Sequence, residues 1–235
     1  MLGYLIATAA LGTATVLGYN SMAPRSQLFG ATFIGRRGSR QLALTYDDGP
    51  NEPYTLRLLE LLELHQVKAT FFMLGCYVVA QPQVARAVAE AGHAIGNHTF
   101  SHPNLIFARR EQTRLELLEC ERALRDAVGE TTRLFRPPHG GRRPDSLRTV
   151  RALGYAPVMW SISGYDWRPD PPETIAARVT RRVRGGEVIL LHDGGHLGLG
   201  TDRSSSIAAT DLIIRHCREQ GYEFVTVPEM LNAIG

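Results

Sequence analysis

Short apolar runs alternate along the chain with longer segments in which apolar residues recur at helical spacing. The apolar runs predict strands, because each is short and is bounded by glycine, proline or polar residues. Strands are expected at about residues 42–46, 69–74, 93–96, 133–136, 155–162, 187–191 and 222–227. Helices are expected at about residues 54–66, 82–91, 109–128, 144–153, 173–184 and 204–220.

Strand and helix alternate about seven times, with no interruption long enough for a second domain. Such alternation indicates a parallel sheet, and the number of repeats favours a closed or nearly closed barrel over an open sheet. We therefore expect a single-domain α/β barrel of the (β/α)7–8 type over residues 41–235. The unusual polar clusters fall at the C-terminal ends of the predicted strands, which is where such barrels build their active sites.

The first 24 residues carry no charge and are mostly apolar or small. The segment has about the length of a membrane span, and its end at Ser21, Met22 and Ala23 resembles a signal-peptidase site. We predict a signal-like or membrane-anchor segment at residues 1–24 and a linker at residues 25–40, with the protein anchored or secreted outside the cytoplasm. The alternatives are a cytoplasmic domain, because basic residues follow the segment rather than precede it, and a helix packed on the soluble domain.

Composition and charge narrow the class of protein. The chain has 235 residues, of which 44% are hydrophobic and 21% charged, as in an ordinary globular protein. A net charge of +3 without a basic block argues against a nucleic-acid partner. The three cysteines, Cys76, Cys120 and Cys217, are odd in number and far apart, so we expect buried free thiols rather than disulfides or a thiolate zinc site.

Two adjacent carboxylates, Asp47 and Asp48, follow the first predicted strand directly. Two like charges repel each other, so their position indicates a positive partner, for which we expect a metal ion. His98 and His102 are four residues apart and could direct both imidazoles at one centre. With Asp48 they make an Asp-His-His set, which is typical of a catalytic zinc site. The alternatives are a turn capped by the two aspartates and a pair of surface histidines.

The other carboxylate, Asp47, is expected to point away from its neighbour Asp48, because side chains alternate along a strand. It would then lie beside the water on the metal and act as general base. His192 closes another strand on the same face and is a candidate general acid. Asp166 could orient that imidazole, and Arg136 could pair with Asp47 and keep it ionised.

Five short motifs resemble, in order and spacing, those of the polysaccharide deacetylases, also called the NodB-homology or carbohydrate esterase 4 family. They are Thr45–Pro50, His98–His102, Arg136–Gly140, Asp166–Trp167 and Leu190–Asp193. The resemblance covers about residues 40–232 and leaves the N-terminal segment unexplained.

The family folds as a distorted barrel and removes acetyl groups from N-acetylglucosamine polymers or, in some members, from acetylated xylan. The resemblance implies that Asp48, His98 and His102 bind a divalent metal, which would be zinc or a similar ion such as cobalt. It also implies that Asp47 is the base and His192 the acid, in agreement with the assignment from the residues themselves.

Further positions follow from the same resemblance. Arg136 and Asp166 would tune the base and the acid, whereas Trp167 and Leu190 would form walls that receive the sugar and the acetyl methyl group. The backbone N–H of His139 would take the oxyanion position beside the metal. The chain departs from the family at His139, where tyrosine is more common, and at Tyr46, where phenylalanine is more common.

These inferences lead to one main hypothesis and two alternatives. We expect a metal-dependent hydrolase that removes N-acetyl groups from N-acetylglucosamine-containing polysaccharide, such as peptidoglycan or chitin-type oligomers, and releases acetate. An O-acetyl esterase that acts on acetylxylan is the alternative within enzymes. A catalytically silent glycan-binding protein is the alternative from another class. Membrane association through residues 1–24 would accompany any of the three.

Overall fold

The structure, a computed structural model, describes residues 15–129 and 131–233. Its strands are β1 (Gln41–Gly49), β2 (Thr70–Met73), β3 (Ala94–Asn97), β4 (Leu134–Phe135), β5 (Ala156–Pro157), β6 (Ile162–Ser163), β7 (Val188–His192) and β8 (Glu223–Phe224). Its helices are α2 (Tyr54–Leu64), α3 (Gly75–Ala80), α4 (Pro82–Glu90), α5 (Arg110–Val128), α6 (Pro144–Ala152), α7 (Pro172–Thr180), α8 (Ser204–Glu219) and α9 (Val227–Asn232), with a 3₁₀ turn η1 (Pro138–Gly140). A further helix covers residues 15–22.

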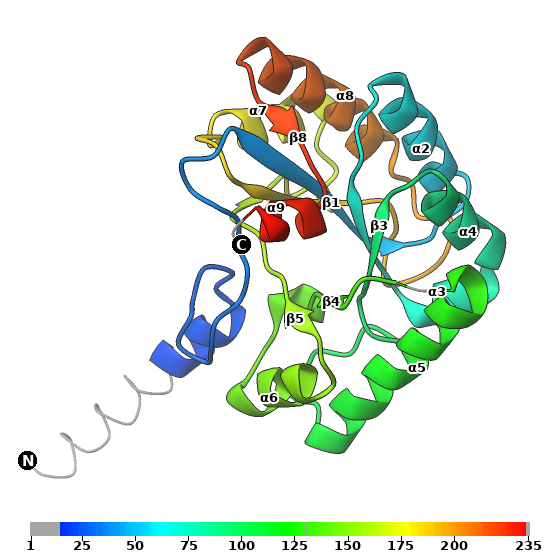
Figure 1. Cartoon of the computed structure of the whole chain (residues 1–235), viewed down its shortest axis with the longest axis vertical. Helices are drawn as coiled ribbons and strands as arrows, with labels where there is room; N and C mark the ends of the chain where they lie inside the picture. The colour runs from blue at the N-terminus through cyan, green and yellow to red at the C-terminus, as the bar shows by residue number, and fades with distance from the viewer. Residues whose placement is uncertain (1–14, 130, 234–235) are drawn as a thin grey trace, which may run out of the picture.

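The strands form one curled sheet in the order β5-β4-β3-β2-β1-β7-β6, and β8 pairs with the start of β1. Every pairing between these strands is parallel. Helices α2 to α8 lie on the outside of the sheet, which curls around the centre of the molecule (Figure 1). This arrangement confirms the expected single-domain barrel. The barrel is distorted because, among the described residues, β5 and β6 at the two ends of the order do not pair with each other.

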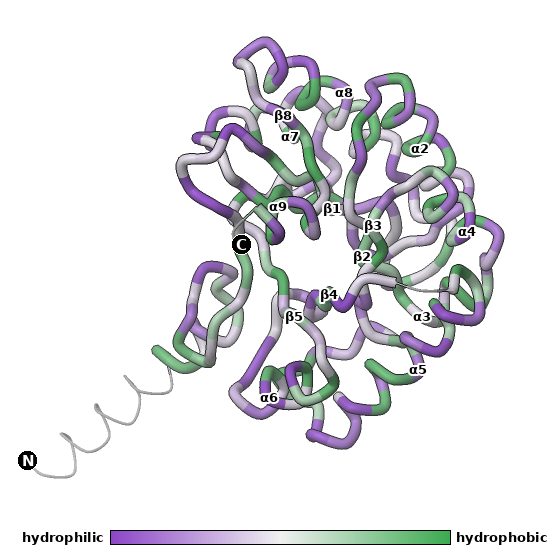
Figure 2. Tube along the Cα trace, viewed as in Figure 1, coloured by the Kyte–Doolittle hydropathy of each residue, from purple (hydrophilic) through white to green (hydrophobic). Residues whose placement is uncertain are grey.

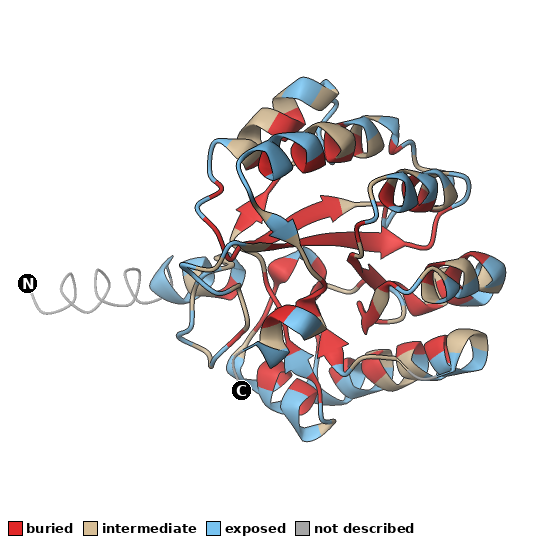
Figure 3. Cartoon of the chain, turned by 45° about the horizontal axis from the view of Figure 1, so that its top comes forward, coloured by how far each residue is buried: buried red, intermediate tan, exposed pale blue. Residues whose placement is uncertain are grey.

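The long central strand β1 divides its side chains between two cores. Leu44 and Tyr46 pack in the large core between the sheet and the outer helices, whereas Ala43 packs in the core inside the barrel. Because side chains alternate along a strand, Thr45 and Asp47 lie on the same inner face as Ala43. The strands other than β5 and β8 are mostly buried, and the outer helices turn a buried side inward and an exposed side outward (Figure 3).

The inner core is closed at the N-terminal ends of the strands by α9. Val227 and Met230 of this helix are fully buried with inward-facing strand residues such as Ala43 and Phe72. The Val227 N–H donates a hydrogen bond to Thr70 Oγ1 at the start of β2, at 2.9 Å. Apolar residues are concentrated in the strands (Figure 2). Because apolar side chains of α9 fill this end of the barrel, the opposite end is left for polar side chains.

The chain ahead of β1 runs along the gap between β5 and β6. Phe33 forms a parallel bridge with Val158, just after β5, and Gly35 forms an antiparallel bridge with Glu187, just before β7. The segment predicted as a linker thus supplies backbone pairing to the barrel on both sides of its gap. Its boundaries as a domain unit stay a prediction.

A buried arginine holds the N-terminal part of this segment against the barrel. Arg142 is 1% exposed, and its guanidinium donates to the carbonyl oxygens of Ala23 at 2.6 Å and Ser26 at 2.9 Å. The Arg142 backbone N–H donates to the Ser21 carbonyl at 3.0 Å. The guanidinium also donates to the Gly140 carbonyl at 2.9 Å, so the same residue ties the segment to η1.

The predicted membrane or signal segment lies partly outside the described residues, since the structure describes it only from residue 15 onward. In the part of the chain that is described, no helix combines the length and the apolar character needed to cross a membrane.

Two local predictions were wrong, and one helix was not predicted. The run at 155–162 is two short strands, because Val158 pairs with Phe33 instead of continuing β5 towards β6. The end of the chain is a two-residue strand followed by α9, not one strand to residue 227. The helix α3 was not predicted, since its six residues carry no side-chain cap and begin at Gly75.

Candidate active site

A cleft of about 920 Å³ opens at the C-terminal ends of the strands. Nine of the ten predicted site residues line it, namely Asp47, Asp48, His98, His102, His139, Asp166, Trp167, Leu190 and His192. The tenth, Arg136, is fully buried beneath the cleft floor and reaches it through Asp47. The structure therefore brings together residues that are up to 145 positions apart in the sequence, from Asp47 to His192.

The two aspartates share the cleft because β1 is irregular at Asp48. Asp47 pairs with Phe72 of β2, and the next paired residue is Gly49 with Met73, so the register shifts between them. Asp48 has φ 69°, in the left-handed region that few non-glycine residues adopt. A bulge of this kind re-aims a side chain next to a site. The expectation that Asp48 and Asp47 point in opposite directions was therefore wrong, since both line the same cleft.

Asp48, His98 and His102 form a cluster that we call the primary donor set. Asp48 Oδ1 lies 3.4 Å from His98 Nε2 and 3.2 Å from His102 Nε2. Zinc bonds of about 2.0–2.1 Å place neighbouring ligand atoms of a tetrahedral site about 3.3–3.4 Å apart. Asp48 Oδ1 is buried and, among the described residues, has no hydrogen-bond partner. One oxygen and two nitrogens at this spacing fit a catalytic divalent metal with an open coordination position.

Backbone contacts fix how these ligands are presented. His98 Nδ1 lies 2.7 Å from the Arg136 carbonyl oxygen, which can only accept, so Nδ1 carries the proton and Nε2 is left as the ligand atom. The His102 backbone N–H donates to Thr99 Oγ1 at 3.1 Å, which holds the turn between the two histidines. Burial alone would raise the pKa of Asp48, but the side chains of His102, His196 and His98 hold it well below its usual range.

Asp47 is bound to a buried arginine. Arg136 Nη1 donates to Asp47 Oδ1 at 2.7 Å and to Thr45 Oγ1 at 2.7 Å. The guanidinium lies over the Phe72 ring at 4.1 Å from its centroid and donates weakly to two backbone carbonyls. Burying a guanidinium without a charged partner would strongly destabilise the fold, so the Asp47 carboxylate also stabilises the buried charge of Arg136. The other oxygen, Oδ2, lies 3.8 Å from His98 Nε2 and faces the primary donor set.

His192 is bound to Asp166 in the same way. His192 Nδ1 lies 2.8 Å from Asp166 Oδ1, and the His192 backbone N–H donates to Oδ2 at 2.8 Å. Ser206 donates to the same Oδ2 at 2.6 Å, so the carboxylate is fixed from both sides. Burial by itself would lower the pKa of His192, but the Asp166 carboxylate outweighs it and raises the pKa to about 9. Because His192 Nδ1 is bound to Asp166, Nε2 is the ring nitrogen left to face the cleft.

His139 stands on the rim of the cleft in an unusual backbone conformation. Its φ is 56°, and it lies between Pro138 and Gly140 in the tight turn η1, which the extended Pro137 precedes. Within the described residues, no protein acceptor takes a hydrogen bond from its backbone N–H. The imidazole is exposed and meets His102 edge to face, with ring centroids 4.5 Å apart.

The cleft walls carry apolar groups suited to contact a ligand. Trp167 is 50% exposed and stands over the His192 ring, with centroids 5.5 Å apart and planes at 89°. Leu190 is buried at the end of the inner face, and Leu197 is 92% exposed on the loop after β7. Met22 of the N-terminal segment also lines the cleft, a contribution that the sequence did not predict.

Tyr46 lies behind the site in the outer core. Its ring stacks on Phe71 with centroids 5.2 Å apart, and its hydroxyl is 3.0 Å from Thr210 Oγ1. The hydroxyl that distinguishes tyrosine from phenylalanine therefore has a buried partner, and the packing is kept.

Besides Met22, two residues that contact the site were not identified from the sequence. Ser206, in the first turn of α8, donates to the Asp166 carboxylate. Arg203, which directly precedes α8, donates to the Asp166 carbonyl oxygen. Nothing in their local pattern distinguishes them from ordinary helix-start residues. For His196 the sequence allows a solvated loop histidine or a contact with substrate; the structure shows it exposed and 3.7 Å from Asp48 Oδ2. Its position, four residues after His192 in a glycine-rich loop, was the available signal.

Comparison with known proteins identifies the family. The family described as polysaccharide deacetylase matches residues 35–158. A peptidoglycan-N-acetylglucosamine deacetylase of Bacillus cereus is 36% identical over 202 residues, which cover 85% of this chain and 71% of the relative. A chitooligosaccharide deacetylase of Sinorhizobium fredii is 36% identical over 199 residues, which cover 82% of this chain and 92% of the relative.

A solved structure agrees with these relatives. The crystal structure of a peptidoglycan N-acetylglucosamine deacetylase in complex with 4-naphthalen-1-yl-N-oxidanyl-benzamide matches with a TM-score of 0.79 at 35% identity. The match covers 85% of this chain and 91% of that chain. The family that the five motifs indicated is thereby confirmed, and the chain belongs to the polysaccharide deacetylases of carbohydrate esterase family 4.

Proposed function

We propose that this protein is a metal-dependent deacetylase that hydrolyses the N-acetyl group of N-acetylglucosamine units in a polysaccharide, releasing acetate and a free amine. The observation that carries the proposal is that one cleft holds three groups together. These are the primary donor set, a carboxylate bound to a buried arginine, and an imidazole bound to a buried carboxylate. The relatives named for peptidoglycan and chitooligosaccharides support the substrate class.

Asp48, His98 and His102 would hold the divalent metal. When bound, such an ion polarises the acetyl carbonyl and makes a water more acidic. Zinc suits one carboxylate oxygen and two imidazole nitrogens, and cobalt accepts the same donors. We therefore propose zinc as the native ion, with cobalt as a functional substitute.

Asp47 would act as general base. Its Oδ1 is engaged by Arg136, whereas Oδ2 faces the primary donor set and can accept the proton of the attacking water. The water oxygen then forms a bond to the acetyl carbon. The backbone N–H of His139 would donate to the oxygen that becomes negative, since no protein group among the described residues competes for it.

His192 would act as general acid. Because Nδ1 is bound to Asp166, the proton that faces the cleft is on Nε2, and it passes to the sugar nitrogen as the carbon–nitrogen bond breaks. An amine is a poor leaving group unless it is protonated. The raised pKa keeps His192 protonated at neutral pH, which suits amide cleavage better than ester cleavage.

Trp167 and Leu190 would receive the sugar and the acetyl methyl group, because one is exposed on the wall and the other is buried at the floor. The relatives that act on peptidoglycan further support an extracytoplasmic location, either secreted or attached to the membrane through the N-terminal segment.

The proposal is tested by acetate release from three substrates: N-acetylglucosamine oligomers, peptidoglycan and acetylxylan. With zinc or cobalt added, we expect activity on the first two. His192→Ala should lower kcat on those amides by about 10²–10⁴-fold, because a general acid contributes about that much, and should lower ester cleavage less.

The matched control is His216→Gln, an exposed histidine near the end of α8, which should behave as the unchanged protein. Acetate release from acetylxylan alone, or amide turnover that survives His192→Ala undiminished, would contradict the proposal.

The pH dependence of kcat/KM should report His192. Its pKa is raised above the ordinary value, so the protonated form that donates exists below about pH 9 and is lost as the pH rises through that value. Asp166→Asn removes the carboxylate that raises this pKa, so the alkaline limb should move to lower pH. An alkaline limb that stays in place in Asp166→Asn would assign it to another group.

A further inference from the structure

Two more histidines stand at the mouth of the cleft beside His102. His139 belongs to η1, and His196 belongs to the loop that follows β7. One ligand atom from each of the three lies within 4.8 Å of the others. We propose that His102, His139 and His196, here called the second histidine set, form a second transition-metal site next to the primary one. The proposal goes beyond deacetylation, since metal binding can be measured without any substrate.

The three rings come from three separate parts of the chain and face one small volume. His196 stacks on His102, with centroids 4.5 Å apart and 21° between the planes. His139 meets His102 edge-on at 4.5 Å and His196 edge-on at 5.1 Å. One nitrogen of each ring is therefore within 4.8 Å of the other two, which is close enough for the three to share one cation.

The spacing favours a second ion over an extra ligand for the first. In the primary donor set, Asp48 Oδ1 is 3.2–3.4 Å from each histidine nitrogen, as one tetrahedral ion requires. His139 and His196 do not join that set, and the two groups of mutually close donor atoms have only His102 in common. His196 approaches Asp48 through the other carboxylate oxygen, Oδ2, at 3.7 Å.

The two ring nitrogens of His102 have different surroundings. Its Nε2 faces Asp48, whereas its Nδ1 is buried and, among the described residues, has no hydrogen-bond partner. His102 as a whole is 9% exposed, so this polar atom has little access to water. A buried polar group without a partner is unusual, and a metal bond would satisfy it. Binding ions through both nitrogens would release the His102 N–H proton to solvent.

The loop that carries His196 is held on both sides of the histidine. The Tyr77 hydroxyl donates to the Gly195 carbonyl at 2.9 Å, and the Gly200 N–H donates to Asn51 Oδ1 at 2.7 Å. A side chain at Gly195 would collide with Thr201, so the loop is also packed closely against itself. The backbone therefore fixes the position of the His196 Cα, and the ring, 40% exposed, lies against His102.

The donor chemistry selects the kind of ion. Three imidazoles suit zinc, copper, nickel and cobalt, whereas magnesium and calcium prefer oxygen ligands. His139 stands where tyrosine is more common in the family, and a tyrosine there would remove one of the three nitrogens. The second histidine set is therefore a property of this chain's own residues.

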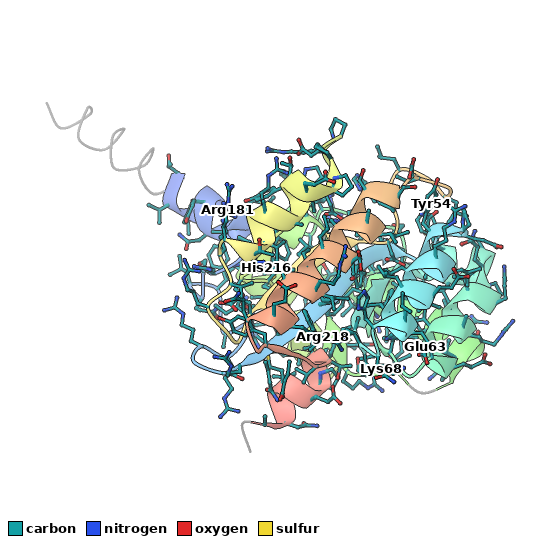
Figure 4. All side chains as sticks on the ribbon, turned by 90° about the horizontal axis from the view of Figure 1, so that it is seen from above. Tyr54, Glu63, Lys68, Arg181, His216 and Arg218 are labelled. Carbon is teal, nitrogen blue, oxygen red and sulfur yellow. The ribbon has the colours of Figure 1, made fainter. Side chains whose placement is uncertain are left out.

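The test is the number of Co²⁺ ions bound by the metal-free full-length protein, measured by equilibrium dialysis and metal analysis. We expect two equivalents for the unchanged protein and one for His139→Asn and for His196→Gln. Asn is chosen at 139 because it tolerates the left-handed conformation there. His216→Gln, on the far part of α8 (Figure 4), is the matched control and should keep two equivalents.

Calorimetric titration in two buffers of different ionisation enthalpy should show proton release with the second equivalent and none of that release in His196→Gln. One equivalent in the unchanged protein, or two equivalents in the double variant His139→Asn/His196→Gln, would overturn the proposal. Neither outcome depends on acetate release, so failure of the second site and failure of the deacetylase assignment are separate results.

Discussion

Asp47→Asn is expected to lower kcat for acetate release by about 10²–10⁴-fold, which is the usual contribution of a general base. The amide is nearly the same size as the carboxylate and keeps an oxygen that can accept from Arg136 at 2.7 Å. It cannot take a proton from water at neutral pH. The number of bound Co²⁺ ions should not change, because Asp47 is not one of the donors in the primary set.

Stability must be measured alongside activity for this variant. Arg136 is 0% exposed, and leaving a buried charge without its partner costs about 3–5 kcal/mol in comparable pairs. Thermal unfolding therefore shows whether lost turnover comes from the missing base or from a damaged fold. A folded Asp47→Asn protein that has lost its metal, or one that turns over normally, would contradict the role given to Asp47.

Asp48→Ala is expected to weaken Co²⁺ binding at the primary site by more than about 10–100-fold, the loss that outer partners of metal ligands already cause. The carboxylate is the only oxygen donor of the primary set, and its Oδ1 is otherwise unpartnered among the described residues. Turnover should fall with metal occupancy. The measurement is competition with a chelator in the His139→Asn/His196→Gln background, so that only the primary site is observed.

The matched control for this variant is Asp126→Ala, which removes an exposed carboxylate on α5. Metal-free Asp48→Ala should fold at least as well as the unchanged protein, because it removes a buried carboxylate next to that of Asp47 and so removes their repulsion. If Asp48→Ala and Asp47→Asn lost metal equally, the division between a ligand and a base would be wrong.

The fold and the convergence of the candidate site residues were predictable because barrel topology gathers strand ends. Each site motif follows an apolar run, and the alternation of strands and helices makes all those ends converge on one face. The pairings His192 with Asp166 and Arg136 with Asp47 were expected from this convergence and from charge, and the structure places both at hydrogen-bond distance.

Backbone geometry was not predictable in the same way. Regular alternation along β1 sends Asp48 away from Asp47, and only the register shift and the φ of 69° bring both into one cleft. Nothing in a string of residue types reports a bulge directly. At the end of the chain the signal was present, because Thr226 and Glu229 form a capping box that marks the start of α9.

Residues that act through the tertiary fold were the hardest to identify. Ser206 supports Asp166 from the start of α8, forty residues further along the chain. His196 approaches Asp48 from a loop held by Tyr77 and Asn51. Each contact depends on how separate elements pack, which local patterns do not specify.

Because Arg142 holds residues 21–26 against the barrel, Met22 of the N-terminal segment forms part of the cleft wall. Cutting the chain after Ala23 would remove Met22 from the cleft wall and the Ser21 carbonyl from the Arg142 N–H. Because Arg142 also binds Gly140, the loss would be transmitted to the turn that presents His139. A chain cut after Ala23 would therefore differ from the intact chain at the entrance to the cleft.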